Sequence, residues 1–142
     1  MASLTLTQAN SIVEGAFAKA GELGLKPLTV TVLDAGGHAI VLARQDGSST
    51  LRPQIARGKA ATALGLGVSS RKVGEMAQER PTFVAALATL APDGIVPAAG
   101  GVLVVDDAGK IIGAVGVTGD TSDQDEACAL AGIDSAGLRA QG

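Results

Sequence analysis

The sequence contains a single histidine, His38, so any imidazole chemistry in this chain must use that residue. An imidazole can transfer a proton near neutral pH or bind a metal ion. His38 lies in a turn between two apolar runs, and Lys110 holds the equivalent place in a second, similar segment. Because a lysine occupies the equivalent turn position, His38 is more simply explained as an exposed turn residue than as a catalytic base.

Charged and polar side chains at the ends of expected strands form a second candidate site. The residues are Arg44, Asp46, Lys59, Thr118 and Asp125. Lys59 stands in the alanine-rich run KAATA, where a charge is out of keeping with its neighbours. Surface salt bridges are one interpretation. In the other, Lys59 holds a ligand carboxylate and Asp125 or Glu126 moves a proton, within one chain or across a subunit interface. That arrangement predicts an enzyme acting on a small organic acid or an aromatic metabolite.

An acidic cluster follows Thr118. Ser122, with Asp125 three residues later, has the spacing of a helix capping box. Asp123 and Glu126 would add negative charge at the helix start, which the helix dipole favours. This interpretation is preferred to a cation site, because the calcium-loop spacing and its glycine are missing. The same acids would raise the pKa of Cys128, which favours a buried hydrophobic role over a nucleophile.

Two similar hairpins are expected to position these residues. Val30–His38 and Val102–Lys110 share an apolar strand, an aspartate, small residues, a glycine and a basic residue, and a second apolar strand follows each. Gly37 and Gly109 can supply the positive φ that such turns need. Both hairpins are therefore predicted to belong to one sheet.

Helices are expected around the hairpins. The predicted helices cover residues 9–23, about 50–66, 70–80, 82–91 and 122–136. The apolar run 111–117 is predicted to be a strand. Its glycines, Gly113 and Gly116, would leave room for a helix or another backbone to pass close by.

Composition limits the classes of function. The 142 residues suit one domain over 1–142, and the net charge is −3. Basic residues are scattered and aromatic residues make up 1% of the chain, so no nucleic-acid partner is expected. No apolar run reaches the roughly 20 residues of a membrane span, and no secretion signal is visible. A cytoplasmic protein without a membrane partner is expected. The 20 glycines and the aliphatic core favour a homo-oligomer.

Four segments resemble the GlcG/HbpS-type haem-binding proteins, which are related to the C-terminal domain of PduO-type corrinoid adenosyltransferases. The segments are VLDAGGHAIVLARQDG (Val32–Gly47), ARGKAATA (Ala56–Ala63), AAGGVLVVDDAGKIIGAVGVTG (Ala98–Gly119) and SDQDEACALAG (Ser122–Gly132). The resemblance implies a profilin-like α+β (α/β) sandwich, in which helices pack on the faces of a mostly antiparallel sheet of about five strands. It also implies a homo-oligomer, from a dimer to an octamer.

The resemblance further implies a small-molecule ligand, haem or a related tetrapyrrole. Haem iron is usually held by His, Cys, Met or Tyr. This chain offers His38, Cys128, Met76 and Met1, and no tyrosine. In haem-binding relatives, the strand after the paired glycines can carry a threonine near the iron, and here that place, in Gly100-Gly101-Val102-Leu103, is apolar. Haem iron would therefore rest on His38 or on a weak oxygen ligand such as Thr118. An accessory subunit without a ligand is the third interpretation.

Overall fold

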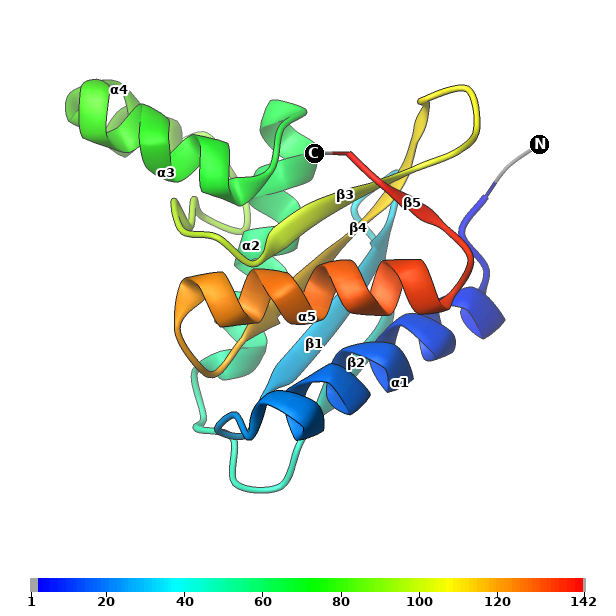
Figure 1. Ribbon diagram of the computed structural model, residues 1–142. Coiled ribbons are helices and arrows are strands. Elements are labelled where there is room, and N and C mark those ends of the chain that lie inside the picture. Colours follow the sequence, from blue (N-terminus) through cyan, green and yellow to red (C-terminus); the bar gives the residue numbers. More distant parts are fainter. Residues whose placement is uncertain (1–2, 142) are drawn as a thin grey trace.

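The computed structural model describes residues 3–141, which form a five-stranded antiparallel sheet with helices on both faces (Figure 1). The strands are β1 (Thr29–Asp34), β2 (Ala39–Arg44), β3 (Gly101–Val105), β4 (Ile111–Thr118) and β5 (Arg139–Ala140). The helices are α1 (Leu6–Leu23), α2 (Arg52–Leu66), α3 (Ser70–Glu79), α4 (Pro81–Leu87) and α5 (Ser122–Ser135). The strand order is β2-β1-β4-β3-β5. The predicted α+β sandwich is confirmed.

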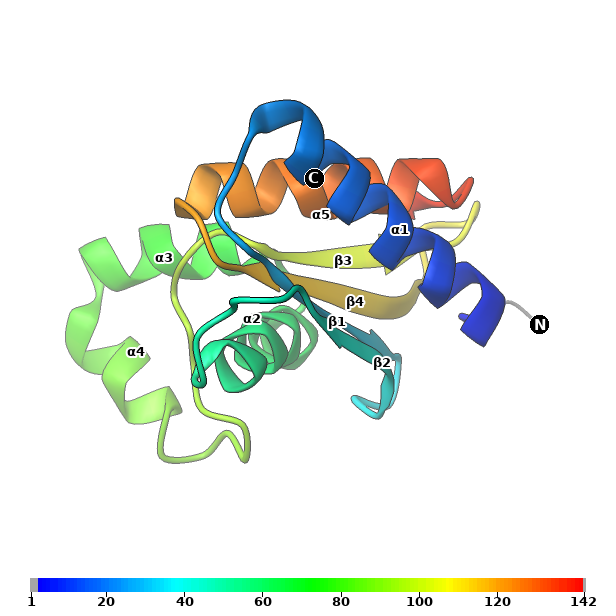
Figure 2. The same ribbon diagram turned by 90° about the horizontal axis from the view of Figure 1, so that it is seen from below.

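The two faces of the sheet carry different helices. Helices α1 and α5 lie side by side on one face and α2 covers the other, while α3 and α4 stand beside the sheet (Figure 2). The larger hydrophobic core lies under α1 and α5, and a smaller cluster lies under α2. Among residues 3–141, none of the helices combines the length and the apolar character that a membrane crossing requires.

Both predicted hairpins are confirmed, and their turns are built alike. The Oδ1 atom of Asp34 accepts the backbone N–H groups of Gly36 and His38. Asp106 does the same for Ala108 and Lys110 in the β3–β4 turn. Gly37 and Gly109 have φ values of 84° and 83°, in the left-handed region that favours glycine. Each turn is therefore specified by its own local sequence.

Helix α2 approaches the sheet closely because glycines lie beneath it. A Cβ atom at Gly116 of β4 would meet the carbonyl group of Ala56, and one at Gly101 of β3 would meet that of Lys59. Backbone atoms of α2 thus occupy the space that side chains would fill. The expectation that Gly116 leaves room for a helix is confirmed, whereas Gly113 makes room for the Leu33 carbonyl of the neighbouring strand.

The predicted capping box at the start of α5 is wrong. Thr121 is the N-cap residue, and its hydroxyl accepts the N–H of Gln124 at 3.3 Å. The carboxylate of Asp125 does not accept a hydrogen bond from the backbone N–H of Ser122. Its side chain is buried, and it accepts hydrogen bonds from Lys59 and from the N–H of Asp120. The carboxylate of Asp125, which the local spacing predicted as part of the cap, is bound instead by Lys59 of α2.

Candidate functional site

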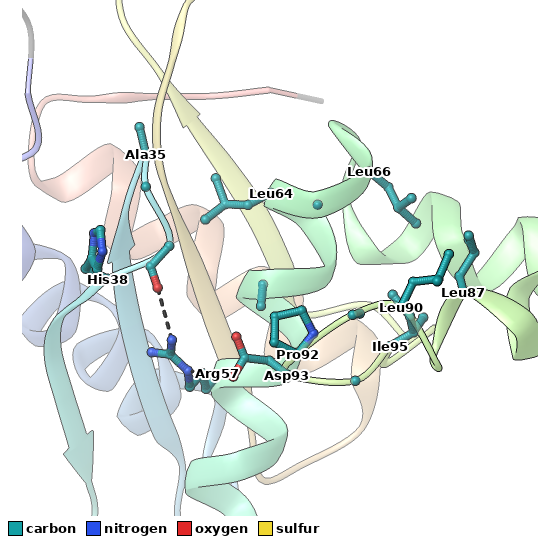
Figure 3. A pocket seen from close by; sticks show the side chains of 16 residues that line it. Ala35, His38, Arg57, Leu64, Leu66, Leu87, Leu90, Pro92, Asp93 and Ile95 are labelled. Carbon is teal, nitrogen blue, oxygen red and sulfur yellow. Dashed lines mark hydrogen bonds and ion pairs between the residues drawn. The ribbon is translucent and has the colours of Figure 1, made fainter.

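A cavity of about 740 Å³ lies between the β1–β2 turn, helix α2 and the segment that follows α4 (Figure 3). Its apolar lining includes Leu64 of α2 and, from the opposite wall, Leu87, Leu90 and Ile95. Its volume falls within the range of small-molecule sites, and an apolar lining with few polar groups is typical of them.

One stripe of α2 forms a wall of this cavity. Arg57, Ala61, Leu64 and Gly65 line it, at the spacing that places residues on one side of a helix. The opposite stripe, which contains Lys59, faces the sheet and is buried. The two sides of α2 therefore serve different purposes, one open to the cavity and one packed in the core.

Arg57 joins the two walls of the cavity. Its Nε donates to Asp93 Oδ1 at 3.1 Å, and its Nη2 donates to the carbonyl oxygen of Gly37 at 3.1 Å (Figure 3). Both charged side chains remain about a third exposed, at 35% for Arg57 and 33% for Asp93. Arg57 is the single lysine or arginine among the residues that line the cavity.

His38 lies at the rim of the same cavity. Its side chain is 82% exposed, and Figure 3 shows the ring across the turn backbone from the leucine side chains. Nδ1 lies 3.2 Å from Asp34 Oδ1. Hydrogen bonds, first of all that from the His38 backbone N–H, lower the pKa of Asp34, so this carboxylate is an acceptor. Nδ1 is therefore the donor in this contact, and in the neutral ring with that tautomer Nε2 has the lone pair that a metal ion needs.

Lys59, Thr118 and Asp125 come together elsewhere, in the interior. Lys59 is 3% exposed, and its Nζ donates to Asp125 Oδ2 at 3.1 Å and to the Val117 carbonyl at 2.9 Å. The Thr118 hydroxyl accepts from Arg52 Nη1 at 2.7 Å. The predicted surface salt bridge of Lys59 is thus wrong, because this ion pair is buried. A pairing of Lys59 with a ligand carboxylate stays a prediction, and such a ligand would have to replace Asp125.

Burying the ion pair between Lys59 and Asp125 removes both charges from water, which is unfavourable. Burial raises the pKa of Asp125, although Lys59 and the N–H of Asp120 counteract it. Burial also lowers the pKa of Lys59, although Asp125 counteracts it. Both shifts favour the neutral forms, because the interior lacks the water that solvates each charge at the surface. The pair nevertheless links α2, β4 and α5 at one point.

The remaining predicted site residues lie at separate surface positions. Arg44 Nη2 donates to the Ser48 carbonyl at 2.7 Å, and Asp46 is exposed in the following loop. Glu126 pairs with Arg71 of α3 at 3.0 Å, and Asp123 contacts the same guanidinium. The structure therefore separates the predicted residues into the cavity rim with His38, the buried Lys59 cluster and the surface.

Of the predicted iron ligands within residues 3–141, His38 alone lines the cavity. Cys128 is buried, and burial followed by the charge of Asp125 raises the pKa of its thiol to about 11. Met76 lies on α3 outside the cavity lining, and Met1 lies outside the described residues. Within the described part of the chain, no three His, Cys, Asp or Glu side chains gather as a metal site.

Two cavity residues, Arg57 and Asp93, were not predicted from the sequence. Arg57 stands close to the conspicuous Lys59 in ARGKAATA, and its helical spacing to Leu64 was the available signal. Asp93 lies in a Pro-Asp-Gly turn, a pattern that indicates a chain reversal and carries no sign of a site.

Comparisons with known proteins agree with this fold. The family described as "Haem degrading protein HbpS-like" matches residues 4–134. An uncharacterised 15.0 kDa protein of Citrobacter freundii, from the dhaT-dhaS intergenic region, is 31% identical over 94% of this chain and 92% of its own length.

Two solved structures share the architecture. The PduOC:heme complex has a TM-score of 0.87 at 22% identity, covering 99% of this chain and 100% of that one. HbpS has a TM-score of 0.80 at 27% identity, covering 94% of this chain and 90% of its own. With a family match over nearly the whole sequence and a shared fold, the chain belongs to the HbpS-like family of haem degrading proteins.

Proposed function

We propose that the protein binds haem, or a related tetrapyrrole, in the cavity between α2, the β1–β2 turn and the segment after α4. One observation carries the proposal. The chain's single histidine stands at the rim of a cavity that one arginine and a group of leucine side chains line. These match the three chemistries that haem presents, namely iron, carboxylates and an apolar ring. The family's description as haem degrading supports the same ligand.

Each part of the ligand has a matching group. Leu64, Leu87 and Leu90 offer the apolar surface for a macrocycle. Arg57 offers a planar cation to a propionate carboxylate. His38 offers Nε2 to the iron, and its exposed side chain can change rotamer to reach the mouth of the cavity. Bound haem would supply iron redox chemistry, and these residues would hold and orient it.

Titration with hemin tests this proposal. The purified protein is expected to give a saturable shift of the Soret band. Leu90, 79% exposed, lies in the cavity wall, and a charge there would oppose the apolar ring. Leu90→Asp is therefore expected to raise the Kd about tenfold or more. Leu6→Asp is the matched control, because Leu6 is 58% exposed on α1, across the sheet.

His38→Ala is expected to weaken binding and to change the Soret maximum, because it removes the iron ligand. Lys110→Ala changes the equivalent residue of the other hairpin and should leave both unchanged. An unchanged spectrum for His38→Ala would remove this residue as the ligand. A flat titration of the wild-type protein would overturn haem binding as a whole.

We also propose that two copies of the chain pair through the edge strand β2. Among residues 3–141, no strand pairs with the outer side of β2. The strand reads Ala39-Ile40-Val41-Leu42-Ala43-Arg44, without charge or proline before its last residue, and Leu42 is 46% exposed. Native proteins protect such edges with charges, prolines or a covering element. A bulge near Leu33 disturbs the first half of β2, and the second half is regular.

Light scattering coupled to size-exclusion chromatography tests this pairing. The wild-type protein is expected to have a mass that is a multiple of the 13.9 kDa chain. Leu42→Lys places a charge on the free edge and is expected to reduce that mass at least twofold. Leu130→Lys, on the similarly exposed Leu130 of α5, should leave it unchanged. A monomeric wild type, or a Leu42→Lys variant of unchanged mass, would contradict edge pairing.

A further inference from the structure

The ion pair between Arg57 and Asp93 lies inside the proposed haem site. Arg57 comes from α2, and Asp93 comes from the Pro92-Asp93-Gly94 turn of the facing wall. The cavity lining contains no other lysine or arginine. A ligand carboxylate that pairs with a lysine or arginine of this cavity must therefore use the guanidinium that Asp93 already contacts.

We propose that Asp93 is an internal competitor for Arg57, and that the site selects ligands whose carboxylate displaces it. This inference rests on the proposed haem site and names the feature that the ligand must carry. A tetrapyrrole with free propionates qualifies, and one whose carboxylates are esterified does not. Asp93 keeps Arg57 neutralised while the cavity holds no ligand, so the cavity favours carboxylates without leaving a bare positive charge.

The geometry makes displacement feasible. Asp93 accepts a single N–H, from Nε at 3.1 Å, whereas a guanidinium has five N–H donors in a planar fork. A ligand carboxylate that accepts two of these donors makes the stronger, bidentate contact. Both partners are about a third exposed, and ion pairs of that kind are weak. The bond from Nη2 to the Gly37 carbonyl can persist and keep the guanidinium in place during the exchange.

The variant Asp93→Asn tests whether the charge of Asp93 competes with the ligand for Arg57. Asparagine has nearly the same shape as aspartate, so the packing is kept while the charge is removed. The variant is expected to bind hemin about threefold to fivefold more tightly than the wild type, the factor that corresponds to losing one weak ion pair. Hemin dimethyl ester, which lacks free carboxylates, should bind both proteins equally. Asp107→Asn is the control, because Asp107 is an exposed acid in the β3–β4 turn, outside the cavity lining.

Arg57→Gln completes the experiment. It should abolish the preference for hemin over its dimethyl ester, while Arg57→Lys should keep part of it. Circular dichroism and the unfolding midpoint show whether each variant is folded, since Arg57 also joins the cavity walls. If the Asp93→Asn and wild-type proteins bind hemin equally, or if wild type does not distinguish hemin from its ester, Asp93 does not compete and haem binding still stands. If neither porphyrin binds wild type, the haem site and this inference both fail.

Discussion

Replacing Lys59 by methionine is expected to lower the free energy of unfolding by about 3–5 kcal/mol. The change leaves the carboxylate of Asp125, 1% exposed, without its cation in the interior. Removing one partner of a buried ion pair is costly, because the remaining charge keeps its desolvation penalty. Urea unfolding followed by circular dichroism measures the loss. Arg71→Met, which breaks an ion pair at the surface, is the control and should cost less than about 1 kcal/mol.

The double variant Lys59→Met with Asp125→Asn should recover much of that stability. It removes the second charge, and the asparagine oxygen can still accept the N–H of Asp120. The double variant distinguishes an unpaired charge from a lost packing contact. A Lys59→Met protein as stable as Arg71→Met would show that the pair contributes little.

The loss in Lys59→Met is also expected to depend on pH. Burial already raises the pKa of Asp125, and without Lys59 the carboxylate is still harder to ionise. The folded variant then binds a proton that the unfolded chain has released, so its free energy of unfolding falls as pH rises above the ordinary range of an aspartate. The deficit relative to wild type should therefore be larger at neutral pH than in mild acid.

Gly116→Ala is expected to destabilise the fold by at least about 3 kcal/mol, at the upper end of the cost of overpacking. The new Cβ would meet the carbonyl of Ala56 and the N–H of Ala60, both backbone groups of α2. Neither can rotate away as a side chain could, so α2 would have to lift from the sheet. Differential scanning calorimetry or urea unfolding measures the loss.

Gly21→Ala is the matched control. Gly21 lies in α1, and no atom from the rest of the fold lies within 4 Å of the place that a Cβ would take. Alanine there should therefore raise stability by up to about 1 kcal/mol through its helix propensity. Equal effects at the two glycines would contradict the close approach of α2 to β4. A folded Gly116→Ala protein of wild-type stability would do the same.

The hairpins could be predicted because their information is local. In each turn an aspartate accepts N–H groups two and four residues further on, and a glycine takes the positive φ. Strand β4 and helix α5 were also predicted, from the apolar run 111–117 and the polar start of α5, whereas the short strand β5 was not. The prediction was wrong where two neighbouring residues could both cap a helix. Ser122 was predicted as the N-cap of α5, and the structure uses Thr121.

The cavity could not be predicted because its polar pair comes from distant segments. Arg57 and Asp93 lie 36 residues apart, and the path of the chain after α4 decides that they meet. Lys59 and Asp125 are 66 residues apart, so neither spacing nor composition indicated that each is the other's partner.

The sequence by itself determined the turns, most strand and helix limits, the small residues beneath α2 and the family pattern. The tertiary structure alone decided that Lys59 faces the core, that Arg57 faces the cavity and that Asp125 leaves the helix cap. The physical reason is that hydrogen bonds in a turn join neighbours along the chain. Whether a helix side chain lies in the core, in a cavity or at the surface depends on which other element packs against that side of the helix.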